Sequence, residues 1–207
     1  MTAGGITTAF VDIGGVLLTP GWDRPARTRA AKFFRLDAED FEERHRMATD
    51  LYEVGRIDLT GYLDLVVFHE QRSFQRDEFR DFMFAQSFPL APAIALAREL
   101  KHQHGLRMVA LSNEGRDLAQ HRIHAFNLGA FTDFFVVSSF VRCRKPDREI
   151  YRMALDIAQV APERVAYIED RKMFAEIAAG LGMHAIHHVS VEGTRAALAE
   201  LGLPGRR

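Results

Sequence analysis

Residues 9–18 read AFVDIGGVLL, with a single carboxylate, Asp12, at the end of an apolar segment and two glycines soon after it. Residues 7–13 are mostly β-branched or aromatic and show no helical periodicity, which predicts a buried strand. The glycines allow the backbone to turn sharply, so Asp12 would lie at the carboxyl end of this strand. Ligands bind at that edge of open α/β sheets, which makes Asp12 a candidate nucleophile or metal ligand. Capping of a turn is the alternative that this segment alone leaves open.

Length and composition predict an ordinary globular protein. The 207 residues are 47% hydrophobic and carry a formal net charge of −1, so we expect one domain, or a core domain with a modest insertion. The balanced charge gives no bulk attraction to nucleic acid or to a membrane surface. A single cysteine, Cys143, excludes an intramolecular disulfide, and no leader or membrane-spanning run is visible. A soluble, cytoplasmic protein without a nucleic-acid or membrane partner is therefore expected.

Residues 20–88 have a purely helical pattern. Asp23 before Pro25 offers an N-cap and a first-turn proline for a helix through Phe34, in line with the usual start signals of helices. Further helices are expected at about 37–54, 58–71 and 74–85. A stretch of this length is too long for a simple loop. We therefore expect residues 20–88 to form an α-helical cap domain over the carboxyl edge of a sheet.

Beyond residue 88 the pattern alternates between helices and short apolar strands. Strands are expected at 107–111, 134–138, 165–168 and 184–188, with helices at 91–104, 116–126, 146–159, 174–181 and 193–201. Together with the first strand, this alternation predicts an α/β fold with a Rossmann-like, doubly wound parallel sheet of about five strands. Residues 1–19 and 89–207 would form this core domain.

Further polar groups follow the other predicted strands at the same edge of the sheet. Ser112 and Asn113 end the second strand, and Lys145 lies at a predicted helix start after the third. A lysine beside helix amides favours an anionic group such as phosphate. Glu169 and Asp170 end the fourth strand, and neighbouring carboxylates suit Mg²⁺. A carboxylate nucleophile, a hydroxyl, a lysine and a metal pair together indicate phosphoryl transfer.

Four short segments occur in order along the chain: DIGGVL at 12–17, LSN at 111–113, RKPD at 144–147 and YIED at 167–170. Each is weak alone, but the ordered set resembles the haloacid dehalogenase-like superfamily of aspartyl-phosphate hydrolases. The helical insertion is similar to the small α-helical cap of this superfamily. The segment YEVGRI at 52–57 is similar to the cap of its sugar-phosphate phosphatase-like branch.

The resemblance implies a nucleophile and a metal site. Asp12 would attack phosphorus and form an aspartyl-phosphate intermediate. Mg²⁺ would be held by Asp12, Asp170 and the main-chain carbonyl of Gly14, with Glu169 among its acidic surroundings.

The resemblance also implies a phosphate-binding cradle. Ser112 and Lys145 would take part in catalysis by binding the phosphoryl oxygens. Backbone N–H groups of Ile13, Gly14 and Asn113 would complete the contacts. A small phosphorylated metabolite is the class of substrate that follows.

Gly14 departs from the pattern of the superfamily, because most of its phosphatases carry a second aspartate there as general acid and base. Such a group supplies a factor of about 10² to 10⁴ in rate. Two hypotheses remain open: restriction to good leaving groups, such as acyl or anomeric sugar phosphates, or an acid from elsewhere in the chain. The candidates for that acid are Asp23, Glu114, His45 and His69.

Three residues are candidates for substrate contacts. Trp22 and Asp23 lie between the first strand and the predicted cap, where they would line the mouth of a pocket. Glu114 directly follows the second motif.

Arg171 and Lys172 follow the fourth motif, where small or amide residues are usual in the superfamily. Pairing of these cations with Asp170 and Glu169 would weaken Mg²⁺ binding, whereas a solvated helix start would leave the site intact. Without a metal, the chain would be a retired phosphatase kept for binding or regulation. This is the alternative function that the sequence leaves open.

Two other branches of the superfamily fit the residues less well. Phosphonate hydrolases need a cap lysine, and Lys32, the only lysine in the predicted cap, lies on an ordinary helix face. Dehalogenases need no metal, which disagrees with the adjacent Glu169 and Asp170.

Overall fold

The computed structural model describes residues 5–203, and its centre is a parallel sheet of five strands in the order β3-β2-β1-β4-β5. The strands are β1 (Thr8–Val11), β2 (Arg107–Ser112), β3 (Phe134–Val137), β4 (Val165–Glu169) and β5 (His184–His187). This arrangement confirms the predicted α/β, Rossmann-like fold.

The register of the central strands aligns their carboxyl ends. Val11 of β1 pairs with Ala110 of β2 on one side and with Ile168 of β4 on the other. Asp12, which follows Val11, is therefore level with the ends of both neighbouring strands. The polar residues of three chain segments meet at one edge for this reason.

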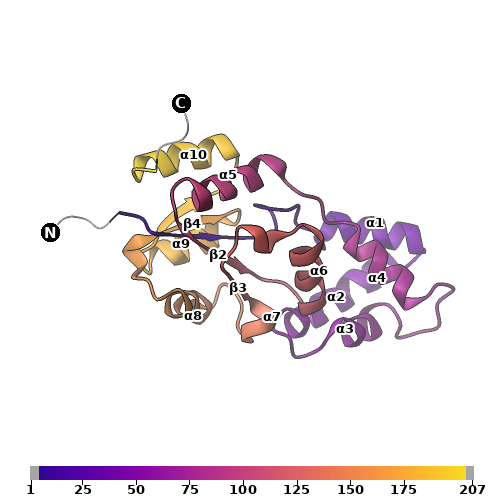
Figure 1. Cartoon of the computed structure of the whole chain (residues 1–207). Helices are drawn as coiled ribbons and strands as arrows, with labels where there is room; N and C mark the ends of the chain where they lie inside the picture. Colours follow the sequence, from indigo (N-terminus) through magenta and orange to yellow (C-terminus); the bar gives the residue numbers. More distant parts are fainter. Residues whose placement is uncertain (1–4, 204–207) are drawn as a thin grey trace.

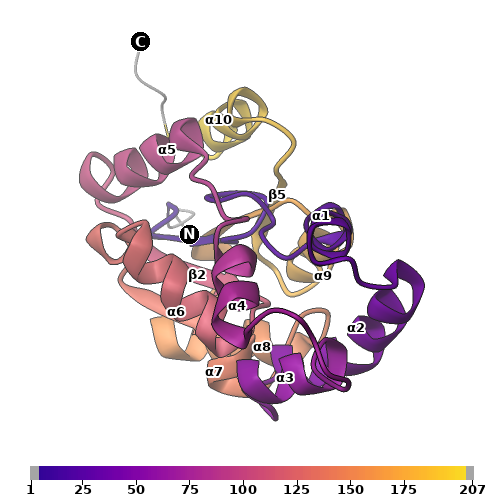
Figure 2. The same cartoon turned by 90° about the vertical axis from the view of Figure 1, so that its right-hand side faces the viewer.

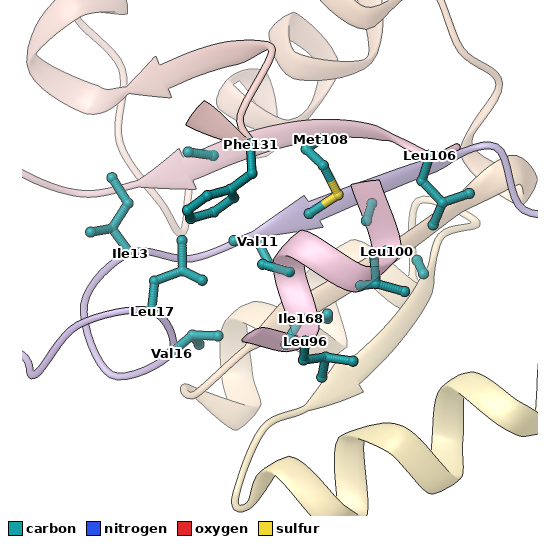
Figure 3. Packing of buried hydrophobic residues seen from close by; sticks show 14 of the residues in the cluster. Val11, Ile13, Val16, Leu17, Leu96, Leu100, Leu106, Met108, Phe131 and Ile168 are labelled. Carbon is teal, nitrogen blue, oxygen red and sulfur yellow. The ribbon is translucent and has the colours of Figure 1, made fainter. Parts of the chain in front are cut away.

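Helices cover both faces of the sheet (Figure 1). One face carries α5 (Ala91–His102) and α10 (Val191–Glu200), and the other carries α8 (Arg148–Ala158) and α9 (Lys172–Ala179). Successive strand residues point to opposite faces, so Val11 and Met108 pack against Leu96 and Leu100 of α5, as Figure 3 shows. Phe10 belongs to the core of the opposite face.

Three further short elements and one longer helix complete the core. Helix α6 (Arg116–Ala125) follows β2 as expected. The sequence did not predict the four-residue α7 (Ser138–Val141) or the 3₁₀ turns η1 (Leu128–Ala130) and η2 (Pro162–Arg164). Such short turns lack the repeated apolar spacing from which longer helices are recognised.

Four helices lie between β1 and α5, and we call them the helical insertion: α1 (Arg24–Phe34), α2 (Ala38–Glu53), α3 (Leu59–Val66) and α4 (Arg76–Phe84). Asp23 caps α1 by accepting a hydrogen bond from the Ala26 N–H at 2.9 Å. Helix α3 ends at Val66 rather than near residue 71. The Arg72 side chain donates to the Val67 carbonyl at 2.7 Å and so satisfies a group that continued helix would have bonded.

The helical insertion lies beyond the carboxyl end of the sheet in Figure 1, and Figure 2 views the molecule from this side. Its core combines aliphatic and aromatic side chains, with Phe34, Phe41 and Phe79 buried in edge-to-face or tilted contacts. No helix within residues 5–203 combines the length and the apolar character needed to cross a membrane.

Candidate active site

A cavity of about 420 Å³ lies between the carboxyl edge of the sheet and the helical insertion. Its lining includes these residues that the sequence singled out: Asp12, Gly14, Trp22, Asp23, His45, Ser112, Asn113, Glu114, Lys145, Asp170 and Arg171. Two others, Ile13 and Glu169, are fully buried next to these residues and do not line the cavity. The structure therefore brings the four sequence motifs together.

Lys145 is the charged centre of the site. Its Nζ lies 3.1 Å from Asp12 Oδ2 and 2.7 Å from Glu169 Oε2, and it donates to the Leu111 carbonyl at 3.1 Å. Asn113 clamps the Lys145 backbone, because its side-chain amide donates to the Lys145 carbonyl and accepts from the Lys145 N–H. Only 1% of the Lys145 surface is exposed, so this ammonium is held in place by its partners.

The charged groups at this centre shift one another's pKa values. Burial raises the pKa of Asp12 to about 6, although the Lys145 charge and hydrogen bonds from Ser112 and Lys145 oppose the shift. Burial alone would lower the pKa of Lys145, but Asp12 and Glu169 outweigh it and raise that pKa. The lysine therefore stays cationic, and a divalent cation beside Asp12 would favour its ionised form.

Asp12, Glu169 and Asp170 form a group that fits a metal ion. One carboxylate oxygen of each lies within 4.8 Å of the others. Asp170 Oδ1 is buried without a hydrogen-bond partner, whereas Glu169 accepts from Lys145, Tyr167 and the Arg171 N–H. Hard carboxylate oxygens of this kind suit Mg²⁺. The donor set thus fits the cofactor expected from the sequence, with Asp170 the most available ligand.

Gly15 lets Asp170 approach the first motif. It has a φ of +84°, and a Cβ at this position would overlap the Asp170 carboxylate. Any side chain here would displace the Asp170 carboxylate, so the glycine is required for space as well as for backbone conformation.

The Ile13 side chain lies in the core, so only its backbone reaches the site. Its N–H donates to Asp12 Oδ1 at 2.7 Å and so orients the carboxylate. The Ser112 hydroxyl lies 3.3 Å from Glu114 Oε1 and lines the cavity.

Glu114 forms a buried ion pair with Arg122, a residue that the sequence did not single out. Arg122 also donates to the Thr19 carbonyl, and its Nη1 would lie 3.5 Å from a Cβ on Gly14. The guanidinium thus lies beside the position that lacks an acid. Its place in an ordinary helical pattern gave no sign of this, because only the fold turns it toward the first motif.

Two of the expected acids have other partners. His45 lines the cavity, but burial lowers its pKa to about 4 and its Nδ1 lies 2.8 Å from the Tyr62 hydroxyl. His69 lies 3.5 Å from Asp40 and is not among the residues that line the cavity. His45 is therefore a neutral imidazole at physiological pH, and its remaining N–H is too weak an acid to protonate a leaving oxygen.

The cations after the fourth motif do not pair with the acidic side chains of that motif. Within residues 5–203, neither Arg171 nor Lys172 forms an ion pair with Glu169 or Asp170. The Lys172 ammonium lies 3.8 Å from Glu176, and the Arg171 guanidinium lies over the Phe174 ring. The solvated helix start is the arrangement that the structure adopts.

A buried strand-end carboxylate, a lysine and an acidic group that meet at one cavity define a Rossmann-like hydrolase with a helical insertion. The sequence pattern of haloacid dehalogenase-like hydrolases matches residues 6–182, and the chain belongs to this family.

Similar proteins and similar solved structures add to this result. The chain is similar to the phosphorylated carbohydrates phosphatase of Thermotoga maritima, with 27% identity over 107 residues that cover 52% of this chain and 50% of that protein. The chain thus spans about half the length of this curated relative.

Solved structures share the fold at low sequence identity. A predicted HAD-like family hydrolase of Porphyromonas gingivalis superposes with a TM-score of 0.76 and 18% identity over 96% of this chain and 98% of that one. A HAD-family enzyme of Bacteroides thetaiotaomicron, solved with magnesium and inorganic phosphate, superposes with a TM-score of 0.72 and 18% identity over 86% and 92%.

Proposed function

We propose that this protein is a Mg²⁺-dependent phosphatase that hydrolyses a small phosphorylated metabolite through an aspartyl-phosphate on Asp12. The observation that carries the proposal is the convergence of Asp12, Lys145 and the acidic group Asp12, Glu169 and Asp170 at one cavity. Residues 1–19 and 89–207 would act as the catalytic core and residues 20–88 as its cap.

The relatives support the same chemistry. A phosphorylated carbohydrate is the substrate class in the name of the Thermotoga protein, and the Bacteroides enzyme was solved with magnesium and phosphate. Both fit the cation and carboxylates of this cavity. A phosphate monoester of a small polar compound is the substrate class that we infer.

Each residue of the site has a task in this reaction. Asp12 attacks phosphorus in line with the leaving oxygen, and Lys145 and Ser112 bind the equatorial oxygens on which negative charge is spread. The N–H groups of Ile13, Gly14 and Asn113 complete the cradle. Glu169 positions Lys145 through the 2.7 Å contact.

Asp12, Asp170 and the Gly14 carbonyl would hold Mg²⁺, with Glu169 beside them. The bound ion would neutralise charge on the phosphoryl oxygens and reduce repulsion between them and Asp12. Trp22, Asp23 and Glu114 line the cavity and would contact the rest of the substrate.

Phosphate release from a panel of alkyl, acyl and anomeric sugar phosphates, with and without Mg²⁺, tests this proposal. We expect Mg²⁺-dependent turnover of at least one ester by the wild type and none by Asp12→Asn. Stabilisation of the wild type by Mg²⁺ against heat should accompany turnover, because a ligand that binds the folded state stabilises it. Absence of both release and metal binding would instead favour a retired phosphatase with a binding role.

A further inference from the structure

Glu53, the last residue of α2, is a cap-side carboxylate that lines the cavity with Asp12 and Lys145. The Arg144 guanidinium lies 3.0 Å from Glu53 Oε2, yet this buried oxygen accepts no hydrogen bond. The contact with Arg144 is therefore electrostatic and leaves the oxygen free to bond a ligand.

The chain on both sides of Glu53 is fixed to the core. The Tyr52 ring lies against Gly115, where a Cβ would overlap it. Gly55, with a φ of +67°, lies against the Ser139 carbonyl, and a Cβ there would overlap that backbone. These two close approaches hold the end of α2 beside the motif residues, so Glu53 reaches the cavity from a rigid position.

Charged groups of both signs face Glu53. Arg144, Arg171 and Lys145 favour its ionised form, whereas Glu114 and Asp12 disfavour it. Burial is the largest influence, and the pKa of Glu53 rises to about 7. A carboxyl group with this pKa exists in both protonation states near neutral pH, as a general acid and base requires.

The other carboxylates that line the cavity have different tasks. Asp12 and Asp170 belong to the nucleophile and metal group, and Asp23 caps α1. Glu114 is held by Arg122 in a buried ion pair, which opposes the rise in the pKa of Glu114 that burial causes. Glu53 is the remaining carboxylate of the cavity lining within residues 5–203.

We propose that Glu53 supplies the proton-transfer group that Gly14 lacks. The inference rests on the proposed phosphatase function. In the first step, the bond between phosphorus and Asp12 forms, the bond between phosphorus and the leaving oxygen breaks, and the Glu53 proton passes to that oxygen. In the second step, water attacks phosphorus, its proton returns to Glu53, and the bond between phosphorus and Asp12 breaks. The products are an alcohol and inorganic phosphate, with both carboxyl groups restored.

Glu53→Gln tests the proposal, with Asp50→Asn as the matched control. Asp50 lies on the same helix and pairs with the same arginine, but its side chain is 72% exposed and does not line the cavity. We expect Glu53→Gln to lower kcat on the best non-aryl ester of the panel by about 10² to 10⁴. Asp50→Asn should stay within a few-fold of the wild type.

The substrate 4-nitrophenyl phosphate distinguishes the two steps, because its leaving group needs no proton and only the attack by water still requires Glu53. Glu53→Gln should release a burst of nitrophenolate and then accumulate phosphorylated enzyme, detectable by intact mass, because water attack lacks its base. On the non-aryl ester, whose leaving oxygen needs the Glu53 proton, kcat/KM of the wild type should decline above about pH 7, and this decline should be absent from the variant. If the side chain at position 53 only fills space, the substitution would produce neither change.

The outcomes distinguish this inference from the proposed function. If the wild type shows no Asp12-dependent release, the phosphatase proposal itself fails and this inference fails with it. Normal turnover by Glu53→Gln in an active, Asp12-dependent enzyme overturns only the role of Glu53. So does a loss found in Glu114→Gln and absent from Glu53→Gln, because it assigns the proton to Glu114. Retained stabilisation of Glu53→Gln by Mg²⁺ would show that its metal site is intact.

Discussion

At the carboxyl edge of the sheet, buried charges neutralise one another, whereas the helical insertion buries neutral polar groups among aromatic rings. In the core, Lys145 lies between Asp12 and Glu169. In the insertion, the Tyr62 hydroxyl accepts from Trp22 Nε1 at 2.9 Å and lies 2.8 Å from His45. Removing one partner leaves an uncompensated charge in the core but only a neutral group in the insertion. The insertion therefore depends less on buried charge than the core does, and its exceptions include Glu53 and the buried Arg27, which pairs with Glu42.

The largest effect expected from this contrast is that of Lys145→Met. Loss of the ammonium leaves Asp12 and Glu169 as two buried carboxylates without a cation, and breaking a buried pair typically costs about 3–5 kcal/mol. Denaturant unfolding should reveal a loss of stability of this order, together with loss of phosphate release.

The matched control for this substitution is Lys101→Met. Lys101 forms a partly exposed pair with Asp133, and pairs at the surface contribute about 0–1 kcal/mol. Equal losses in the two variants would contradict the view that the core depends on its buried charges.

A smaller effect on stability is expected when the pH is lowered, because His45 in the helical insertion then becomes protonated. The folded pKa of His45 is about 4 and its ordinary value is 6.5, so between these values the unfolded chain binds the proton and the folded chain does not. The stability contributed by neutral His45 is complete above pH 6.5 and is lost as the pH falls toward 4. The loss is on the order of 3 kcal/mol at most.

The measurement is the free energy of unfolding between pH 7 and 4 for the wild type and His45→Gln. The variant should lose less stability on acidification, because Gln binds no proton in this pH range. Arg27 and Glu42, whose charges also act on His45, are retained in the variant. Hydrogen exchange should locate the acid-induced opening first in α2 and α3. Parallel pH curves for the two proteins would exclude His45 as the source.

The smallest effect on stability is expected from alanine substitutions at the two adjacent glycines, Gly15 and Gly14. Gly15→Ala should cost at least about 1 kcal/mol, because its φ of +84° disfavours a side chain. It should also reduce stabilisation by Mg²⁺, since the new Cβ overlaps the Asp170 carboxylate. Thermal unfolding with and without Mg²⁺ measures both changes.

Gly14→Ala is the control for Gly15→Ala. A Cβ on Gly14 has its nearest neighbours at 3.5 Å, an ordinary contact distance, so stability should change by less than about 0.5 kcal/mol. A full response to Mg²⁺ in Gly15→Ala would contradict the metal site at Asp170.

Most elements of the fold were predictable because their signals are local. Apolar runs between helical patterns identified all five strands, and Asp23 identified the start of α1. The predicted end of α3 was wrong. The Arg72 side chain, which lies beyond the helix, bonds the Val67 carbonyl in place of a further helical N–H. The division of the chain into core and cap domains stays a prediction.

The order of the motifs also predicted which residues meet. Asp12, Ser112, Lys145 and Asp170 line one cavity, because parallel strands present their carboxyl ends at a common edge. The roles of these residues stay proposals until the variants are measured.

The sequence by itself determined the sheet, its helices and the residues at its carboxyl edge, since periodicity and strand ends are written in neighbouring positions. The absence of an acid at Gly14 was equally visible there. Only the tertiary structure decided what stands near that position: Arg122 from α6 and Glu53 from α2. Their protonation and pairing depend on burial and on charges from distant segments, and no local pattern encodes these.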